Sequence, residues 1–505
     1  MFSSGPPSTT STCSSSSSLS CTSSCSSQTS AGQLTFNLDS TSLSLRLGSK
    51  HAGTPKEILP QDITLEMYQK WPYKGLRPGI SIRIIRAVVS TTSMANTTTE
   101  YTLHVTDPHT QVFWSVKKLY RDFAVMRQKM RALYRRAMGS SGQVDHVRAL
   151  FDLPFPKRQF RFTTNVKLIE KKREDLDFFV RNVAALQPNC ELHVAILQEL
   201  QDLVCSKEFA TSLENIDTSE EPVAPKWLSY NFFSKLNSYT RTEGQTCYKL
   251  VSSFRQRVNS SKAFLYQSAE DTSSSKTEAE TMLRDLRNVL TTIESYIVDH
   301  MTPAERTVLA DLESDREENV SRNATCGTLE TNSTSKLENL VHIACEDTIL
   351  IPLERQISAL LDRTVDQEKE LKVATNIARL REKTQQELGI PEHLRSEDGW
   401  GKSCHHLSMM DEQPLAAMKI QELLASALEV FRNCGGKCLE WGENSALTAD
   451  DYLPIHIYVV VHCGLKQPWR LKEYLGAMIH PSKMLGETGY FLTMFEVALN
   501  YIANL

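Results

Sequence analysis

The sequence predicts a multidomain α+β protein in which a small three-stranded antiparallel sheet with helices is followed by an all-α helical bundle. Three observations support this fold class. Residues 80–116 contain three short runs in which apolar and polar residues alternate, which is the period of half-buried strands. Apolar residues recur at helical spacing directly afterwards, from Phe123 to Ala137. Helical spacing returns at Leu337 and continues to Gln386.

The composition is that of an ordinary globular chain with two or three domains. The 505 residues are 40% hydrophobic and 23% charged, which is enough apolar content to build real cores. The net charge of -4 gives no global field that favours nucleic acid as a partner, so any basic site must be local. The longest apolar run, residues 455–461, is far shorter than the roughly 20 residues that a membrane-spanning helix needs. The N-terminus lacks the basic start and apolar stretch of a secretory signal, so we expect none.

The 12 cysteines are scattered along the chain, and without a secretory signal we expect them to be reduced thiols. Two clusters, Cys404-His405-His406 and Cys434 with Cys438, contain residue types that bind zinc. Their spacing matches no standard zinc motif, because such sites are normally announced by paired ligands. We therefore expect no metal site and no cofactor.

Three regions lie outside the two main patterns. Residues 1–34 are rich in serine and threonine with almost nothing to bury, which predicts a disordered tail. Residues 35–78 gain apolar residues without a clear period, and the sequence assigns them no structure. Residues 206–334 are predicted to be a partly helical linker. Within this linker, the helical pattern of residues 278–312 fits an added layer of the C-terminal bundle as well as a coiled partner helix.

A folded pattern covers residues 79–205. The turn at Asp107-Pro108-His109 separates the second and third alternating runs, so the three runs predict an antiparallel meander. The helix from Phe123 follows, then a proline turn at residues 153–157 and two amphipathic helices, the last running from Glu191 to Cys205. The alternating residues are Ile80, Ile82 and Ile84, then Tyr101, Leu103 and Val105, then Val112, Trp114 and Val116.

This order of strands, helix, proline-lysine turn and helices resembles the phox-homology (PX) domain, a reader of phosphoinositides. The matching pieces are residues 118–123, the turn that ends at Lys157, and Lys171-Lys172 before Leu176. The resemblance implies that Tyr120 stacks on the inositol ring, Lys157 binds the 1-phosphate and Lys172 meets the ring hydroxyls. Lys118 and Arg121 add positive charge beside Tyr120, and we include both among the predicted lipid-binding residues.

The sequence departs from the PX pattern at one position. The family's second basic residue, which holds the phosphate at the inositol 3-position, is replaced by Leu119. A leucine cannot donate the charge-assisted hydrogen bond, a loss of roughly 1.5–3 kcal/mol. We therefore expect binding to an anionic phosphoinositide membrane to depend on total charge more than on the 3-phosphate, with Phe160 and Phe162 dipping into the interface. The alternative is that these charges form a solvated helix face and that the phenylalanines close the core.

Near the C-terminus, the stretch from Thr448 to Pro454 predicts a helix start. Thr448 with Asp451 forms a capping box, and early carboxylates suit the positive end of the helix dipole. Pro454 removes the hydrogen bond to the carbonyl of Asp450, four residues earlier. We therefore expect the helix to kink or loosen at Asp450 and to leave this acid on an irregular turn.

A second C-terminal stretch, residues 486–496, predicts another helix start. Thr493 with Glu496 has the spacing of a capping box, and Leu492 with Val497 has that of a hydrophobic staple. This interpretation places Tyr490 on the preceding loop, where its ring and hydroxyl are available to a partner. Burial of the tyrosine is an equally common outcome.

Together the two stretches resemble the vacuolar-protein-sorting-nine (VPS-nine) domain. That family carries an acid–acid–x–Leu–Pro helix start followed by a Gly-Tyr-x-Leu-Thr segment, and the resemblance extends over most of residues 338–505. We assign residues 335–505 to this domain. The family exchanges guanine nucleotide on endosomal Rab GTPases of the Rab-five type. Its inserted acid corresponds to Asp450, its helix proline to Pro454, and its partner-contacting residues to Tyr490 and Thr493.

The resemblances predict a guanine-nucleotide exchange factor that promotes release of GDP from a Rab-five-type GTPase without covalent chemistry. The expected location is the cytoplasmic face of the early endosome, with the PX-like domain as the membrane-binding part. The alternative is a non-catalytic endosomal adaptor that binds the Rab GTPase and anionic lipid without emptying the nucleotide site. A hydrolytic enzyme is disfavoured, since no nucleophile–base grouping is visible in the sequence.

Overall fold

The structure is a computed structural model of the 505-residue chain. It describes residues 33–37, 44–48, 65–69, 80–93, 96–108, 112–138, 144–157, 165–186, 188, 190–207, 223–237, 241–261, 272–310, 333–440, 447–484 and 486–505. The predicted disorder of residues 1–32 lies outside the described residues, as do Phe160 and Phe162. None of the helices in the described ranges is long and apolar enough to cross a membrane.

The predicted three-stranded meander is confirmed. Strands β3 (Ser81–Ser93), β4 (Asn96–Thr106) and β5 (Phe113–Leu119) pair antiparallel in the order β3-β4-β5. The register places Ile84 opposite Leu103 and Leu103 opposite Val116, and a bulge follows Ile84. One face of the sheet carries the buried apolar residues that the alternation predicted. These are Ile82, Ile84, Tyr101, Leu103, Val105 and Trp114.

Four helices complete this first core. They are α2 (Tyr120–Ala137), α3 (Val144–Asp152), α4 (Val166–Ala184) and α5 (Glu191–Val204). Phe123, Met126 and Met130 of α2 are buried against the sheet, as their spacing indicated. The indole of Trp114 donates a 3.0 Å hydrogen bond to the carbonyl of Val204, which ties α5 to β5. The sequence analysis did not predict helix α3.

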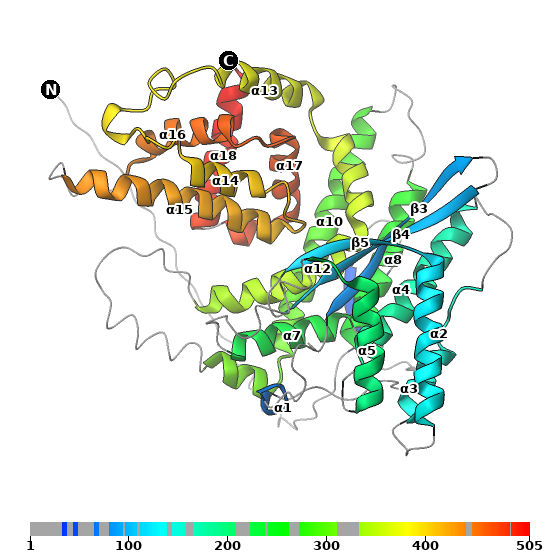
Figure 1. Ribbon diagram of the computed structural model, residues 1–505. Coiled ribbons are helices and arrows are strands. Elements are labelled where there is room, and N and C mark those ends of the chain that lie inside the picture. Colours follow the sequence, from blue (N-terminus) through cyan, green and yellow to red (C-terminus); the bar gives the residue numbers. More distant parts are fainter. Residues whose placement is uncertain are drawn as a thin grey trace, which may run out of the picture.

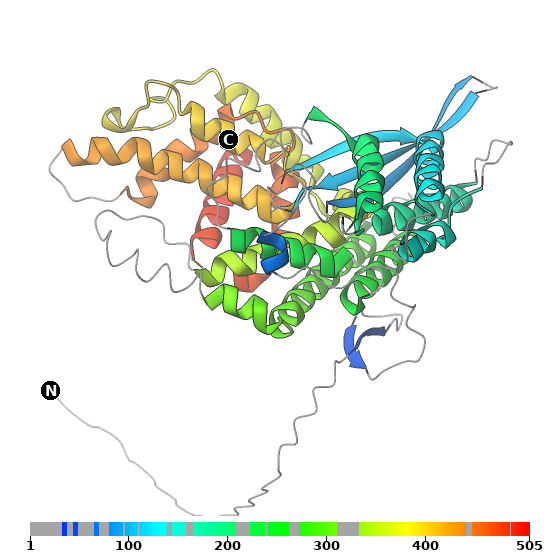
Figure 2. The same ribbon diagram turned by 60° about the horizontal axis from the view of Figure 1, so that its bottom comes forward.

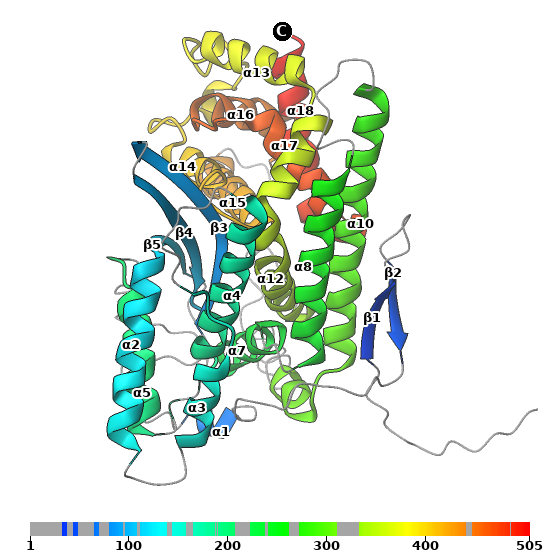
Figure 3. The ribbon, with the colours of Figure 1, turned by 90° about the vertical axis from the view of Figure 1, so that its right-hand side faces the viewer.

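Residues 35–78, which the sequence left unassigned, contain three short elements. Strands β1 (Gln33–Asn37) and β2 (Ser44–Gly48) form an antiparallel hairpin, and α1 (Leu65–Gln69) follows. The prediction of a disordered tail over residues 1–34 is therefore wrong for Gln33 and Leu34, which pair with β2. The hairpin lies beside the helices of the linker region, below the main body in Figure 2 and at the right in Figure 3.

The region predicted as a linker supplies long helices to a second core. These are α7 (Val223–Asn237), α8 (Thr242–Ser260) and α10 (Thr272–Asp299). They pack on α12 (Ser333–Thr364), and their buried side chains belong to the same hydrophobic cluster as those of the C-terminal helices. Figure 3 shows α8, α10 and α12 side by side. Helix α10 is therefore an added layer of the C-terminal bundle.

The C-terminal bundle occupies one side of the molecule and the sheet with α2–α5 the other (Figures 1 and 2). Its apolar centre includes Trp400, Tyr452 and Phe495, each almost fully buried. The elements are α13 (Gln367–Leu380), η2 (Glu392–Leu394), α14 (Gly401–Met409), α15 (Ala416–Glu440), α16 (Ala449–His462), α17 (Pro468–Met478), η3 (Pro481–Met484) and α18 (Glu487–Ala503).

The two cores meet at a buried ion pair between β3 and α12. Arg83 Nη2 lies 3.1 Å from Asp347 Oδ2, and both side chains are 3% exposed or less. Thr106 Oγ1 donates a 2.7 Å hydrogen bond to the other carboxylate oxygen, and His104 Nε2 lies 3.5 Å from it. Burial opposes ionisation of Asp347, yet Arg83 and these partners lower its pKa to about 2. The carboxylate therefore stays charged inside the protein.

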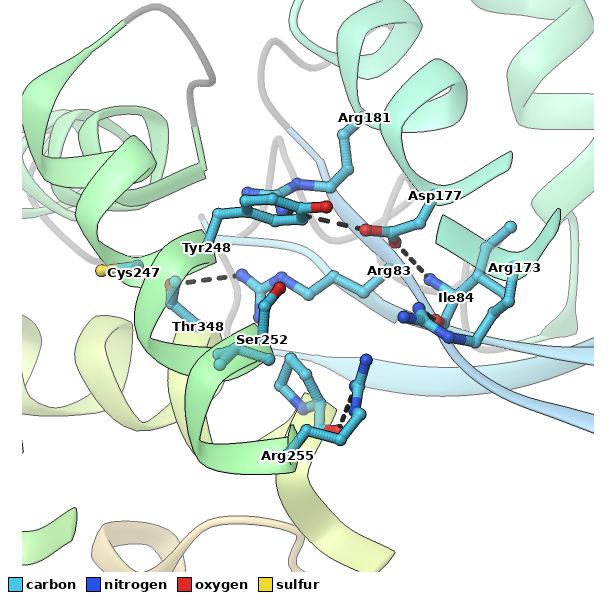
Figure 4. A pocket seen from close by; sticks show the side chains of 12 residues that line it. Arg83, Ile84, Arg173, Asp177, Arg181, Cys247, Tyr248, Ser252, Arg255 and Thr348 are labelled. Carbon is cyan, nitrogen blue, oxygen red and sulfur yellow. Dashed lines mark hydrogen bonds and ion pairs between the residues drawn. The ribbon is translucent and has the colours of Figure 1, made fainter. Parts of the chain in front are cut away.

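Arg83 also reaches the linker helices. Its guanidinium donates to Thr348 Oγ1 at 3.2 Å and to the side-chain oxygen of Asn237 on α7. Figure 4 shows Arg83 extended from β3 towards Thr348, with Asp177 of α4 accepting the backbone N–H of Ile84. A small cavity lined by several of these residues measures about 30 Å³, which is room for roughly one water molecule.

A second buried charge network joins α10, α12 and α15. His342 lies 2.6 Å from Glu294 and 3.1 Å from Glu346, and Glu346 accepts the backbone N–H of Ala417 at 2.9 Å. Burial opposes protonation of His342, but the two glutamates raise its pKa to about 9. The imidazolium therefore holds two carboxylates, one of which satisfies a free N–H at the start of α15.

We predict that the buried ion pair at the junction matters far more than the exposed pair next to it. Asp347→Asn leaves the Arg83 charge buried without a counterion and should lower the free energy of unfolding by about 3–5 kcal/mol. Glu354→Gln, on the same helix, removes the partner of Arg86, a pair at 3.4 Å with both side chains about half exposed or more. This control should cost about 1 kcal/mol or less. Urea unfolding of both variants is the measurement, and equal losses would contradict the assignment.

Candidate functional site

The predicted helix start at Thr448 is confirmed. Thr448 is the N-cap of α16, and its hydroxyl oxygen accepts the backbone N–H of Asp451 at 3.2 Å. The same hydroxyl donates to the carboxylate of Asp451 at 2.6 Å. The carboxylate of Asp451 is therefore engaged in the helix cap.

Asp450 is the acid that remains available. Its side chain is exposed, and it forms no hydrogen bond or ion pair with any residue that the structure describes. Asp450 lies in the first turn of α16, where the positive end of the helix dipole faces it. The structure thus separates two adjacent acids into one that caps the helix and one that faces solvent.

The prediction of an irregular turn at Asp450 is wrong. Helix α16 begins at Ala449 and continues through Pro454, and its first turn is closed by a 2.9 Å hydrogen bond from Tyr452 N to Thr448 O. The fixed φ of proline suits a helix, so Pro454 removes the N–H that would bond the Asp450 carbonyl without ending the helix. Pro454 is four residues after Asp450 and shares its helix face.

The prediction that α18 starts at Thr493 is also wrong. The helix begins at Glu487, because Gly486 at φ +75° is an N-cap conformation that side-chain-bearing residues rarely adopt. Tyr490 N bonds Gly486 O at 3.0 Å, so Tyr490 lies on the helix and not on a loop. Thr493 caps nothing, since its hydroxyl donates to the carbonyl of Gly489 at 2.7 Å.

Tyr490 and Thr493 nevertheless face outward together. They are three residues apart on α18, which places them on one helix face. The Tyr490 side chain is 41% exposed, and its ring packs edge-on against Phe491 with centroids 5.0 Å apart. Phe491 itself is buried and anchors the tyrosine to the bundle.

A cluster of rings brings the two helix starts together. Tyr452 stacks on Phe431 of α15 with centroids 5.6 Å apart, and it meets Phe491 edge-on at the same distance. Tyr452 follows Asp450 by two residues, and Phe491 follows Tyr490 by one. The exposed carboxylate and the exposed phenol therefore lie at the same end of the bundle, on adjacent helices.

The interior of this end is kept uncharged. The Tyr452 hydroxyl lies 3.2 Å from Nδ1 of the fully buried His456, whose ring stacks on that of Tyr452. Burial lowers the pKa of His456 to about 4 and raises the pKa of Tyr452. Both rings are neutral at pH 7, so the charge at this surface comes from exposed side chains such as Asp450.

The predicted lipid-binding residues are partly brought together. The Tyr120 hydroxyl donates a 2.6 Å hydrogen bond to the carbonyl of Pro156, which places the first turn of α2 beside the turn that bears the exposed Lys157. Arg121 is exposed and pairs with its neighbour Asp122 at 3.6 Å. The remaining two residues, Lys118 at the end of β5 and Lys172 on α4, are half-buried, and burial lowers the pKa of Lys172.

Arg127 of α2 is a residue of this region that the sequence analysis did not single out. Its guanidinium lies 4.5 Å from the ring centre of Phe155 and donates a 2.8 Å hydrogen bond to the carbonyl of Phe151. Burial lowers its pKa. Arg127 therefore holds the proline turn in place, and its spacing of seven residues after Tyr120 was the available signal.

Two family models match the chain. Residues 400–505 match the vacuolar sorting protein 9 (VPS9) domain, and residues 106–198 match the PX domain. The predicted combination of the two domains is confirmed, and Asp450, Pro454, Tyr490 and Thr493 all fall within the VPS9 match.

The chain is also similar to several curated proteins. It is 24% identical to Ras and Rab interactor 3 of Mus musculus, over 45% of this chain and 21% of that protein. It is 22% identical to Protein sprint of Drosophila melanogaster, over 42% of this chain and 11% of that protein. It is 27% identical to Ras and Rab interactor 2 of Mus musculus, over 34% of this chain and 18% of that protein. The chain thus aligns with about a fifth or less of the length of these relatives.

We predict that Gly489 is required for the α18 start. A Cβ at this position would lie 1.7 Å from the carbonyl oxygen of Met484, so Gly489→Ala should lower the free energy of unfolding by about 3 kcal/mol. Gly476→Ala on α17 is the control, because a Cβ there meets nothing within 4 Å. It should be neutral or stabilise by about 0.5–1 kcal/mol. Thermal unfolding checks both, and a stable Gly489→Ala variant would contradict the packing described.

Proposed function

We propose that this protein is a guanine-nucleotide exchange factor for Rab-five-type small GTPases, that it promotes the release of GDP, and that its PX domain recruits it to the cytoplasmic face of the early endosome. The observation that carries the proposal is the exposed carboxylate of Asp450 at the start of α16, which has no partner among the described residues and lies at the same end of the bundle as the exposed Tyr490 of α18. The VPS9 match over residues 400–505 and the similarity to proteins named for interaction with Ras and Rab support it.

The mechanism follows from charge. A small GTPase holds its nucleotide through a phosphate-binding loop, the lysine of that loop and a magnesium ion. A carboxylate placed beside the loop repels the phosphates and pairs with the lysine once the nucleotide leaves. Each tenfold acceleration of release requires about 1.4 kcal/mol of binding that is selective for the state leading to the empty GTPase. No covalent bond is made or broken.

Each predicted residue has a position that fits this mechanism. Asp450 is the inserted acid. Pro454 lies on the same face one turn later and presents an apolar surface beside the acid. Tyr490 and Thr493 form the adjacent face on α18, where they contact the switch region of the GTPase in our proposal. Because the rings of Tyr452 and Phe491 are buried, the two faces are held together before the partner arrives.

We predict that Asp450→Asn folds normally and loses most exchange activity. Replacing the carboxylate by an amide should slow the stimulated release of fluorescent GDP from a Rab-five-type GTPase by about 10- to 100-fold, the loss of one charge-assisted contact. The matched control is Asp451→Asn, which alters the helix cap and should cost about 1 kcal/mol of stability while it retains exchange. Release at the wild-type rate by Asp450→Asn would refute the assignment.

The same assay separates exchange from the adaptor alternative. An adaptor binds the GTPase but leaves the release rate of GDP unchanged for the wild type as well as for both variants. A panel of purified Rab GTPases in this assay identifies the preferred partner.

The PX domain is proposed to contact an anionic phosphoinositide membrane through Tyr120, Lys157 and Lys172, with Arg121 and Lys118 adding charge. Leu119 is the N-cap residue of α2 and has no group that can hold a 3-phosphate. Each basic residue near an anionic leaflet contributes about 1 kcal/mol.

We predict that liposome sedimentation of the wild type follows the total negative charge of the lipid and not the phosphoinositide isomer. Leu119→Arg restores a guanidinium at the missing position and should create a preference of about tenfold or more for the 3-phosphate isomer. Lys157→Gln is expected to weaken binding to all isomers alike. Sharp 3-phosphate selectivity of the wild type would overturn this interpretation of Leu119.

A further inference from the structure

Helix α18 carries a stripe of exposed apolar side chains, and the mechanism above uses only one end of it. The stripe consists of Tyr490, Val497 and Tyr501, whose side chains are 41%, 39% and 49% exposed. They are three of the nine large apolar side chains that are exposed in the described part of the chain, although α18 has only 17 residues. Exposed apolar side chains that gather on one surface indicate a site of interaction with a partner.

The stripe continues the helix face that carries Thr493. Thr493, Val497 and Tyr501 follow Tyr490 by three, seven and eleven residues, and these spacings place all four side chains on one side of an α-helix. At about 1.5 Å per residue, the distance along α18 from Tyr490 to Tyr501 is about 16 Å. The stripe therefore begins at the proposed GTPase contact and extends well beyond it.

The polar groups of the stripe are available to a partner. The hydroxyls of Tyr490 and Tyr501 form no hydrogen bond with a residue that the structure describes. Glu496, the neighbour of Val497, is already paired with Lys472 of α17 at 3.3 Å. Each tyrosine thus offers a ring and a free hydroxyl, and the charge next to Val497 is compensated within the protein.

The uncompensated charge near the stripe lies at its Tyr490 end. Glu487 is the first residue of α18, is exposed, and forms no ion pair or hydrogen bond within the described ranges. Asp450, the other exposed acid without such a partner, lies at the same end of the bundle. A partner that covers the whole surface must therefore present a cation beside an apolar patch.

We propose that Val497 and Tyr501 extend the GTPase-binding surface, and that they bind an apolar patch next to the switch region while Asp450 enters the nucleotide site. This inference rests on the proposed function and names further contacts of the same partner. A GTPase that has lost its nucleotide exposes the lysine of its phosphate-binding loop, which complements the acidic end of the surface. The apolar end then supplies the desolvated contact in which tyrosines contribute most to affinity.

One GTPase is large enough to cover the stripe. A stable protein–protein interface buries about 800 Å² on each partner, which corresponds to a patch about 30 Å across. The distance of about 16 Å from Tyr490 to Tyr501 is roughly half of that width. A GTPase that contacts Asp450 and Tyr490 therefore reaches Val497 and Tyr501 within one interface of ordinary size.

The charges disfavour two other occupants of this surface. An anionic membrane is repelled by Asp450 and Glu487. A second copy of this chain, paired antiparallel along the stripe, would remove the acids of each copy from water against Tyr501 of the other copy without a counterion. A parallel pairing would bring the like charges of the two copies together.

The two ends of the surface have different effects on exchange in this proposal. Contacts made by Val497 and Tyr501 do not involve the nucleotide, so they have the same strength before and after GDP leaves. Such uniform binding lowers the concentration of exchange factor needed for half-maximal stimulation and leaves the maximal rate unchanged. Asp450 contacts the site that GDP leaves and therefore sets the maximal rate.

The test is the release of fluorescent GDP from a Rab-five-type GTPase, measured against the concentration of the full chain. Val497→Asp places a charge in the apolar contact and Tyr501→Ala removes a ring. Each should raise the half-saturating concentration by about tenfold and keep the maximal rate within about twofold of the wild type. Val166→Asp is the matched control, because Val166 is 75% exposed on α4, away from the stripe, and it should behave as the wild type does. Unchanged half-saturating concentrations for both stripe variants would overturn the proposal.

A binding measurement separates this proposal from the exchange activity on which it rests. The dissociation constants of the same variants for the nucleotide-free GTPase should rise by about the same factor of ten, even if the wild type binds the GTPase without accelerating release. Equal binding by the wild type and both stripe variants would refute the extended surface. A wild-type dimer in sedimentation that Val497→Asp converts to a monomer, with GTPase binding unchanged, would also refute it, because a second copy would then be the occupant.

Discussion

The buried ion pair between Arg83 and Asp347 determines how the two halves of this protein fit together. Each half has its own apolar core, but the contact between them is a polar layer in which one guanidinium serves an aspartate on α12, a threonine beside it and an asparagine on α7. A flat apolar contact can slide, whereas a planar guanidinium matches its acceptors in one arrangement only. The pair therefore fixes the register of the sheet on α12. Neutral replacements of both partners could be equally stable but would not impose that register.

The fixed register of the sheet on α12 determines how the two proposed binding surfaces are placed relative to each other. Tyr120 and Lys157 belong to the unit built around the sheet, while Asp450 on α16 and Tyr490 on α18 belong to helices that pack on α15. Helix α12 contacts β3 of the sheet and also α15 and α17 of the C-terminal bundle. The Glu346 carboxylate connects α12 to the start of α15. If the PX-matched region attaches to a membrane as proposed, it would then present the proposed exchange surface in a defined orientation. The linker region contributes to this arrangement, because α7, α8 and α10 are part of the same core as the C-terminal helices.

The parts that the sequence predicted correctly depend on local pattern, and the parts that it missed depend on distant contacts. The alternation of Ile82 and Ile84 indicated a strand because one face of the sheet is buried against the apolar core. Thr448 and Asp451 indicated a helix cap because the two residues are only three positions apart in the sequence. Thr493 and Glu496 have the same spacing but cap nothing. The start of α18 is instead set by Gly486 and by the close approach of Gly489 to Met484, which no spacing rule reveals. The Arg83–Asp347 pair joins residues 264 apart, so its partner could not be identified from either position alone.

We propose that Asp450 enters the site that the nucleotide leaves, and a structure of this protein bound to a nucleotide-free Rab-five-type GTPase tests this insertion. We expect the Asp450 carboxylate to lie within ion-pair distance of the lysine in the phosphate-binding loop, with Tyr490 against the switch region. A complex in which the GTPase docks on another surface, or in which Asp450 remains in solvent, would refute the proposed role of Asp450.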